Sequence, residues 1–224
     1  MPRSLRTDVG DMIYHVINRA NARLQIFHTD SDYTLFEEVL TQAQKRTEVR
    51  IFSFCVMPNH WHLIVQPKND GDLAKFVGWL TMTHTQRWHA SHDSVGTGHL
   101  YQGRYKSFPV QSDEYFLWVN RYVERNPLRA KLVTRAEHWR WGSAWRRLVG
   151  TVEEKDLLSV WPTPAPKDYS DWLNENENED LLKNIRTSVN KGSPFGSEQW
   201  REDVIKKFGL QSTIRSRGRP KKGS

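Results

Sequence analysis

The sequence His60-Trp61-His62 places two imidazoles on either side of a tryptophan. The apolar, aromatic run that begins there ends at Gln66-Pro67 and predicts a β-strand, in which alternate side chains point to opposite faces. The two histidines then share one face, and the tryptophan lies on the other. Two neutral imidazole nitrogens held side by side could bind a divalent cation that polarises a phosphoryl oxygen. In the alternative, the two histidines are partly buried and hydrogen-bonded and have no metal. A His-x-His sequence without further support favours this alternative.

A phenol and a carboxamide follow on a predicted helix over residues 112–125. Ser112 is its expected N-cap, and a proline after Asn126 ends it. Tyr122 and Asn126 are four residues apart and lie on one stripe of the helix, so both side chains can address the same point. Tyr115 lies two turns earlier on nearly the same stripe. Spacing alone therefore leaves two candidate nucleophiles.

These two segments and three others together resemble a known family, the REP-associated tyrosine transposases, within the wider HUH class of single-strand transposases. The matching segments, in the family's order, are residues 14–20, 57–62, 101–107, 121–130 and 139–143. Several spaced motifs in order are far less expected by chance than one His-x-His pair, and they cover about the first two-thirds of the chain. Ala20 stands where many relatives carry glycine, a departure whose effect should be confined to a turn.

The resemblance implies that His60 and His62 bind Mg²⁺ or Mn²⁺, with Asn126 as the third ligand. It also implies that Tyr122, rather than Tyr115, attacks a phosphodiester to form a 5′-phosphotyrosine and free a 3′-hydroxyl. The implied substrate is single-stranded or hairpin DNA of palindromic repeats in bacterial genomes, which the enzyme would nick and rejoin without ATP. Imidazoles are unusual ligands for such hard cations, so this ligand set rests on the resemblance.

The balance of charges favours an anionic partner, because the formal net charge is +7. The residues expected to contact DNA phosphates in the main domain are Arg104, Lys106, Arg121, Arg125 and Arg129. In the tail, Arg217 and Arg219 belong to an Arg-Gly-Arg-Pro sequence that resembles the core of a minor-groove AT-hook. A disordered basic tail that attracts phosphates through counterion release is an equal alternative.

Hydrophobic periodicity predicts an α+β fold. Strands are expected at residues 12–18, 49–56, 60–65 and 105–110, and helices at residues 32–46, 73–89 and 112–125. This β-α-β-β-α-β order with an added helix is typical of a ferredoxin-like antiparallel sheet, in which the third strand, with both histidines, is central. The resemblance implies that the added helix brings Tyr122 toward them. His15, His84, His89 and His92 are interpreted as structural or solvated.

The composition changes after residue 147. We expect residues 1–147 to form the catalytic domain, residues 148–180 a Pro-rich and acidic linker, and residues 181–224 a small, mostly helical, basic DNA-binding extension. Helices expected at 181–190 and 197–208 could form a helix-turn-helix reader or pack against the main domain. Packing is the more frequent behaviour of short amphipathic helices.

The remaining features point to a cytoplasmic, nucleoid-associated bacterial protein. Cys55 is the only cysteine, which excludes an internal disulfide, and the sequence shows neither a secretory signal nor a membrane-spanning run. A replication initiator or relaxase would share the chemistry but usually has other motif orders. A non-catalytic nucleic-acid-binding regulator with a ferredoxin-like sheet is the alternative from another class. Family members include dimers and monomers, so both oligomeric states stay open.

Overall fold

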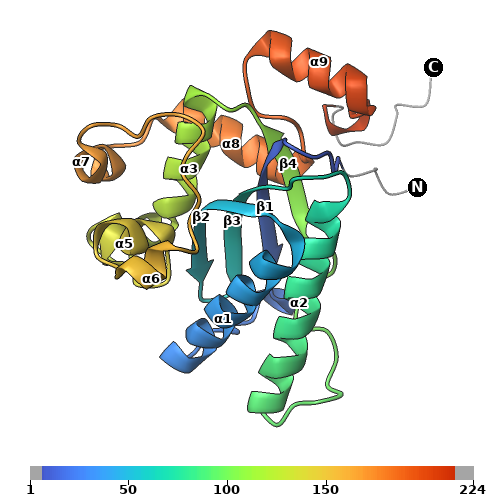
Figure 1. Cartoon of the computed structure of the whole chain (residues 1–224), viewed down its shortest axis with the longest axis vertical. Helices are drawn as coiled ribbons and strands as arrows, with labels where there is room; N and C mark the ends of the chain where they lie inside the picture. The colour runs from blue at the N-terminus through green and yellow to red at the C-terminus, as the bar shows by residue number, and fades with distance from the viewer. Residues whose placement is uncertain (1–6, 215–224) are drawn as a thin grey trace, which may run out of the picture.

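A four-stranded antiparallel sheet with helices on both faces forms the centre of the computed structural model, which describes residues 7–214 (Figure 1). Its strands are β1 (Ile13–Arg19), β2 (Arg50–Met57), β3 (His60–Gln66) and β4 (Lys106–Val110). Their order is β2-β3-β1-β4, and all neighbours are antiparallel. The expected α+β, ferredoxin-like arrangement is confirmed, and β3 is a central strand.

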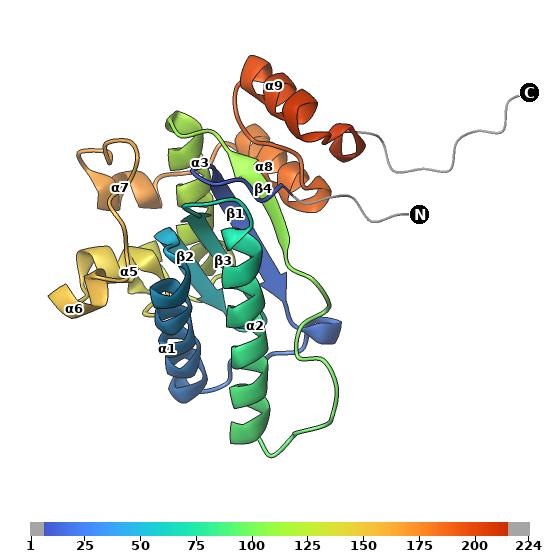
Figure 2. The ribbon, with the colours of Figure 1, turned by 45° about the vertical axis from the view of Figure 1, so that its right-hand side comes forward.

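Helices α1 (Asp30–Thr47) and α2 (Asp72–Ser91) cover one face of the sheet, and α3 (Glu114–Glu124) and α8 (Glu179–Lys191) cover the other (Figures 1 and 2). The other α-helices are α4 (Asn126–Arg129), α5 (Ser143–Leu148), α6 (Val152–Lys155), α7 (Tyr169–Asn174) and α9 (Glu198–Phe208). Short 3₁₀ turns lie at Asn21–Arg23, Ala136–His138 and Gln211–Thr213. Every helix within the described residues is too short or too polar to cross a bilayer.

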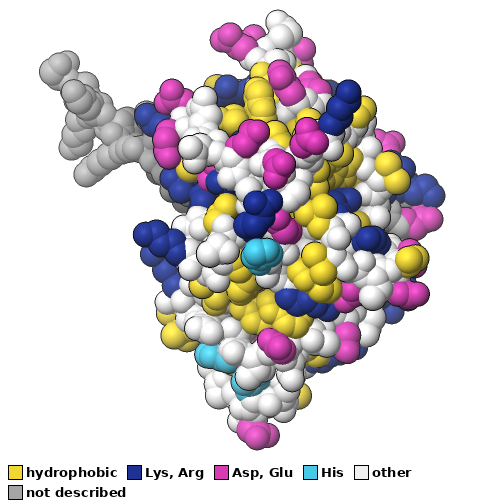
Figure 3. Space-filling model, turned by 90° about the vertical axis from the view of Figure 1, so that its left-hand side faces the viewer, with side chains coloured by type: hydrophobic (Ala, Val, Ile, Leu, Met, Phe, Trp, Pro, Cys, Tyr) yellow, Lys and Arg dark blue, Asp and Glu magenta, His cyan; other side chains and the backbone are white. Residues whose placement is uncertain are grey.

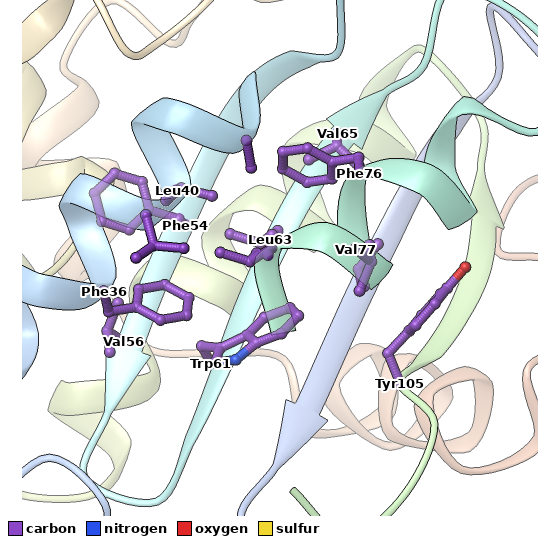
Figure 4. Close-up of a cluster of buried hydrophobic side chains, with 14 of the residues drawn as sticks. Phe36, Leu40, Phe54, Val56, Trp61, Leu63, Val65, Phe76, Val77 and Tyr105 are labelled. Atoms are coloured by element: carbon purple, nitrogen blue, oxygen red, sulfur yellow. The ribbon is translucent and has the colours of Figure 1, made fainter. Parts of the chain in front are cut away.

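Strand β3 divides its side chains between the two faces as its sequence predicts. Trp61 and Leu63 enter the core beneath α1 and α2, where Phe36 is one of their neighbours (Figure 4). His60 and His62, the residues on either side of Trp61, point to the opposite face of the sheet, toward α3.

Helix α3 begins at Glu114, and its N-cap corrects the sequence-based expectation. Asp113, not Ser112, is the cap, and its carboxylate accepts a hydrogen bond from the backbone N–H of Tyr115 at 3.0 Å. A carboxylate is favoured there because it also interacts with the positive end of the helix dipole. The helix ends at Glu124, immediately before the short helix α4.

Helix α8 packs on the sheet domain, as short amphipathic helices were expected to do. Leu182 and Ile185 share a buried cluster with Phe116 of α3, and Phe195 forms an isolated parallel bridge with Val110 of β4. This packing does not test which parts of the chain fold alone, so the three-part division stays a prediction. The Arg-Gly-Arg-Pro sequence of the tail lies outside the described residues.

Two successive buried hydrogen bonds connect Trp61 to α2. Its indole N–H donates to the Tyr101 hydroxyl at 3.0 Å, and that hydroxyl lies 2.8 Å from Nδ1 of His84. Burial lowers the pKa of His84 to about 3, so the imidazole is neutral and can accept the phenol proton. The interpretation of His84 as a structural histidine is confirmed.

We predict that His84 makes the protein less stable in acid. In the unfolded chain an imidazole binds a proton near pH 6.5, whereas His84 in the folded chain stays neutral down to about pH 3. The free energy of unfolding therefore falls as the pH decreases below 6.5. His84→Gln keeps a neutral acceptor, and its loss of stability between pH 6.5 and pH 5 should be about 1.5 kcal/mol smaller in urea unfolding. Equal losses would contradict the prediction.

Candidate active site

A cavity of about 410 Å³ lies where β3 meets helices α3, α4 and α8. His60 and His62 of β3, Tyr122 of α3 and Asn126 of α4 line it together. Arg186 of α8 lines it as well. The structure thus brings into one cavity the four residues that the sequence marked as candidates for catalysis and metal binding.

The two imidazoles stand side by side, with ring centroids 5.0 Å apart. Nδ1 of His60 lies 2.6 Å from Oδ1 of Asn59, an oxygen that can only accept. Nδ1 therefore carries the proton, and Nε2 of His60 keeps its lone pair. Burial is the main cause that lowers the pKa of His60 to about 3 and that of His62 well below its ordinary value. Both rings are neutral at physiological pH, as metal ligands must be.

His15 belongs to this site, a role that the sequence-based interpretation missed. It is fully buried on β1, and its Nε2 lies 2.8 Å from Nδ1 of His62. A cation on Nε2 of His62 requires the proton to be on Nδ1, which then donates to His15. Alternation could have placed His15 on the same face as Arg19. Its contact with His62, however, depends on the pairing of β1 with β3, which periodicity does not reveal.

Tyr122 is the phenol that faces the histidines. Its ring centroid lies 5.9 Å from that of His62, and the guanidinium of Arg129 lies 4.5 Å above its ring. Burial raises the pKa of Tyr122 above its ordinary value, while Arg129 and two further arginines act in the opposite direction. Tyr115 instead packs against Trp118 and does not line the cavity. The structure therefore separates the two tyrosines that spacing left as alternatives.

Asn126 is oriented by its own helix. Its Nδ2 donates to the carbonyls of Tyr122 and Val123, at 3.3 and 3.1 Å, which leaves Oδ1 without a hydrogen-bond partner among the described residues. Residues 7–214 contain no group of three His, Cys, Asp or Glu side chains suited to a metal ion. Two imidazoles and an amide oxygen nevertheless fit a divalent cation that takes its other ligands from phosphate and water oxygens.

The predicted phosphate contacts near the tyrosine, Arg121, Arg125 and Arg129, all contact residues 173–177. Arg121 and Arg125 donate to backbone carbonyls of this segment. The carboxylate of Glu177 lies 2.7 Å from Arg129 and 3.5 Å from Arg125. DNA contact by these three residues stays a prediction. A phosphate would have to bind N–H groups that are still free, or replace the carbonyls and the carboxylate as the hydrogen-bond acceptor.

Arg104 and Lys106 lie beside the candidate active site. They line a second cavity of about 290 Å³ together with Arg19 and Asn190, which also line the first. The two cavities therefore share a wall, and Arg19, Arg104 and Lys106 line the second one. On the face of the molecule shown in Figure 3, by contrast, lysines and arginines are interspersed with acidic residues. The excess positive charge is not gathered on that face.

Comparisons with known proteins identify a family and a similar fold. The family model described as "Transposase IS200 like" matches residues 8–126. A solved structure described as a REP-associated tyrosine transposase bound to a REP hairpin is similar over 80% of this chain and 99% of its own, with a TM-score of 0.57 and 17% identity. A putative transposase from Deinococcus radiodurans R1 is similar over 55% of this chain and 97% of its own, with a TM-score of 0.40 and 19% identity. No curated protein matches the chain.

We predict that Glu177 stabilises the protein through its arginine pairs. Glu177→Ala leaves Arg125 and Arg129 without their carboxylate partner in a mostly buried place, and should lower the free energy of unfolding by about 3 kcal/mol. Glu175→Ala is the matched control, because residue 175 contacts Arg121 through its backbone carbonyl and its side chain is exposed. This control should cost less than about 1 kcal/mol. Urea unfolding measures both, and equal effects would contradict the assigned role of Glu177.

Proposed function

Because this chain belongs to the IS200-like transposase family, and hence to a class of DNA-processing enzymes, we propose that it nicks and rejoins single-stranded DNA at hairpins through a covalent bond to Tyr122. The observation that carries this proposal is the cavity in which that phenol faces His60 and His62. The similar solved structure is described as bound to a REP hairpin, which supports a palindromic hairpin as the substrate class.

In the proposed cleavage, the phenol oxygen of Tyr122 attacks the phosphorus of a phosphodiester. The bond between that oxygen and phosphorus forms, and the bond from phosphorus to the 3′ oxygen breaks. The phenol loses its proton to water, and the departing 3′ oxygen takes up a proton. One phosphodiester thus replaces another, so a 3′-hydroxyl can later attack the 5′-phosphotyrosine and rejoin the strand without ATP.

His60, His62 and Asn126 would hold Mg²⁺ or Mn²⁺ beside the reacting phosphate. A cation bound there would neutralise charge on the non-bridging oxygens. The buried, neutral histidines retain the lone pairs that this role needs, and the hydrogen bond that Nδ1 of His60 donates to Asn59 leaves Nε2 available. Arg129 covers the phenol ring and donates to the backbone carbonyl of Tyr122, and so restrains the nucleophile.

We predict a covalent protein–DNA adduct that depends on Tyr122. The protein is incubated with Mg²⁺ or Mn²⁺ and with labelled hairpin oligonucleotides taken from palindromes that flank its gene, and the products are separated on a denaturing gel. Tyr122→Phe should abolish the adduct because it removes the attacking oxygen. Tyr115→Phe is the matched control and should retain it, because Tyr115 lies on the same helix outside the cavity.

The same experiment tests the alternative of a non-catalytic regulator. Tight binding of these hairpins with no nick and no adduct, under either cation, would overturn the catalytic proposal and favour that alternative. An adduct that persists in Tyr122→Phe but disappears in Tyr115→Phe would assign the nucleophile to the other tyrosine.

We further predict that removal of the metal stops cleavage but leaves hairpin binding largely intact. EDTA, or His62→Gln, should lower the rate of adduct formation about 100-fold or more, the order of magnitude that a lost electrostatic contact to the transition state costs. Mn²⁺ binding to the protein without DNA, followed by electron paramagnetic resonance, should weaken in His62→Gln. Undiminished Mn²⁺ binding would contradict the assigned ligand, whatever the activity.

A further inference from the structure

Two arginines at the cavity carry positive charge that no acidic side chain of the described residues neutralises. Neither Arg19 nor Arg186 forms an ion pair within residues 7–214, although both line the cavity of Tyr122. Arg129, the third arginine there, is already paired with Glu177 and bonded to the Tyr122 carbonyl. The unneutralised charge in this cavity therefore belongs to Arg19 and Arg186.

Arg19 is fixed by the sheet. It is the last residue of β1 and lies directly opposite His60 of β3, so both side chains are on the same face. Its Nε is buried and makes no hydrogen bond. A buried N–H group without a partner is costly, and an acceptor that enters the cavity would satisfy it. Arg19 therefore offers a hydrogen-bond donor and a positive charge beside the imidazoles.

Arg186 approaches the same cavity from α8, far from Arg19 in the sequence. Its neighbours Leu182 and Ile185 are buried against α3 and hold the helix in place, whereas Arg186 itself is exposed at the rim of the cavity. It lies beyond residues 8–126, the part of the chain that the family model matches. The family comparison therefore assigns no role to this residue.

We propose that Arg19 and Arg186 bind the non-bridging oxygens of the scissile phosphate and hold it beside Tyr122, an inference that rests on the proposed function. The planar fork of a guanidinium matches a phosphate group and its bonds to phosphate are charge-assisted. Arg19 supplies this contact from the sheet and Arg186 from α8. Helix α8 thus completes a cavity whose other walls come from β1, β2, β3, α3 and α4.

The test measures whether the contribution of each arginine to binding affinity depends on the charge of the scissile phosphate. Binding is measured in a Tyr122→Phe background, which prevents cleavage, to the hairpin oligonucleotide that gives the most adduct with the wild-type protein. A second oligonucleotide carries an uncharged methylphosphonate at the scissile linkage, mapped beforehand from the length of the released fragment. Arg19→Gln and Arg186→Gln should each weaken binding of the phosphodiester about tenfold. Each should change binding of the methylphosphonate less than about twofold.

Lys183→Gln is the matched control for Arg186. Lys183 lies on the same exposed side of α8, one turn earlier, and lines neither cavity. Its substitution removes the same charge but should affect both oligonucleotides equally. Arg186→Lys, which keeps the charge without the fork, should bind the phosphodiester with intermediate affinity.

The outcomes separate this inference from the function on which it rests. If the wild-type protein forms an adduct but the arginine variants lose the same affinity for both oligonucleotides, or lose none, the inference is overturned and the proposed function stands. Urea unfolding of each variant separates such a loss from misfolding, and a wild-type affinity of Arg186→Lys for the phosphodiester would also count against a fork contact. If no hairpin gives an adduct with the wild-type protein, the proposed function fails and the inference fails with it.

Discussion

The geometry of the candidate site depends on the burial of Trp61. Its side chain is completely enclosed beneath α1 and α2, and its N–H is bonded to Tyr101, so it cannot turn outward without a large loss of buried apolar area and a buried hydrogen bond. Side chains alternate along a strand, and a slip by one residue would exchange the two faces. With Trp61 fixed, His60 and His62 must both point to the opposite face. The core on one side of the sheet thus positions the candidate ligands on the other.

A second constraint fixes the rotation of α3. The buried carboxyl of Glu124 accepts hydrogen bonds from Asn120, from Ser143 of α5 and from Tyr169 of α7. Burial raises the pKa of Glu124, while these donors and the nearby Arg147 oppose the shift. Residues two apart on a helix point in directions that differ by roughly 200°. Anchoring Glu124 on the side of α5 and α7 therefore turns Tyr122 toward the histidines.

Local patterns were sufficient for the elements and for the faces of β3, because the period-two alternation is a property of a few adjacent residues. They were insufficient where a contact depends on how helices and distant segments pack on the sheet. Tyr115 and Tyr122 share a stripe, and only the packing of α3 separates them. His15, Glu177 and Arg186 reach the site from segments far apart in the sequence, and no spacing rule relates them to His62 or Tyr122. The N-cap of α3 was misplaced by one residue, because Ser112 and Asp113 are adjacent and both are good caps.

The cavity keeps the candidate nucleophile protonated in the free protein and places positive charge beside it. Burial raises the pKa of the Tyr122 phenol, so the free protein holds it protonated at neutral pH. The same burial lowers the local dielectric, which strengthens the effect of any cation placed beside the oxygen. Arginines already act in that direction, and in the proposed reaction a divalent cation between the imidazoles would add to them. A bound phosphodiester would oppose deprotonation of Tyr122 through its own negative charge, so the arginines and the cation would have to neutralise that charge before the phenol can attack.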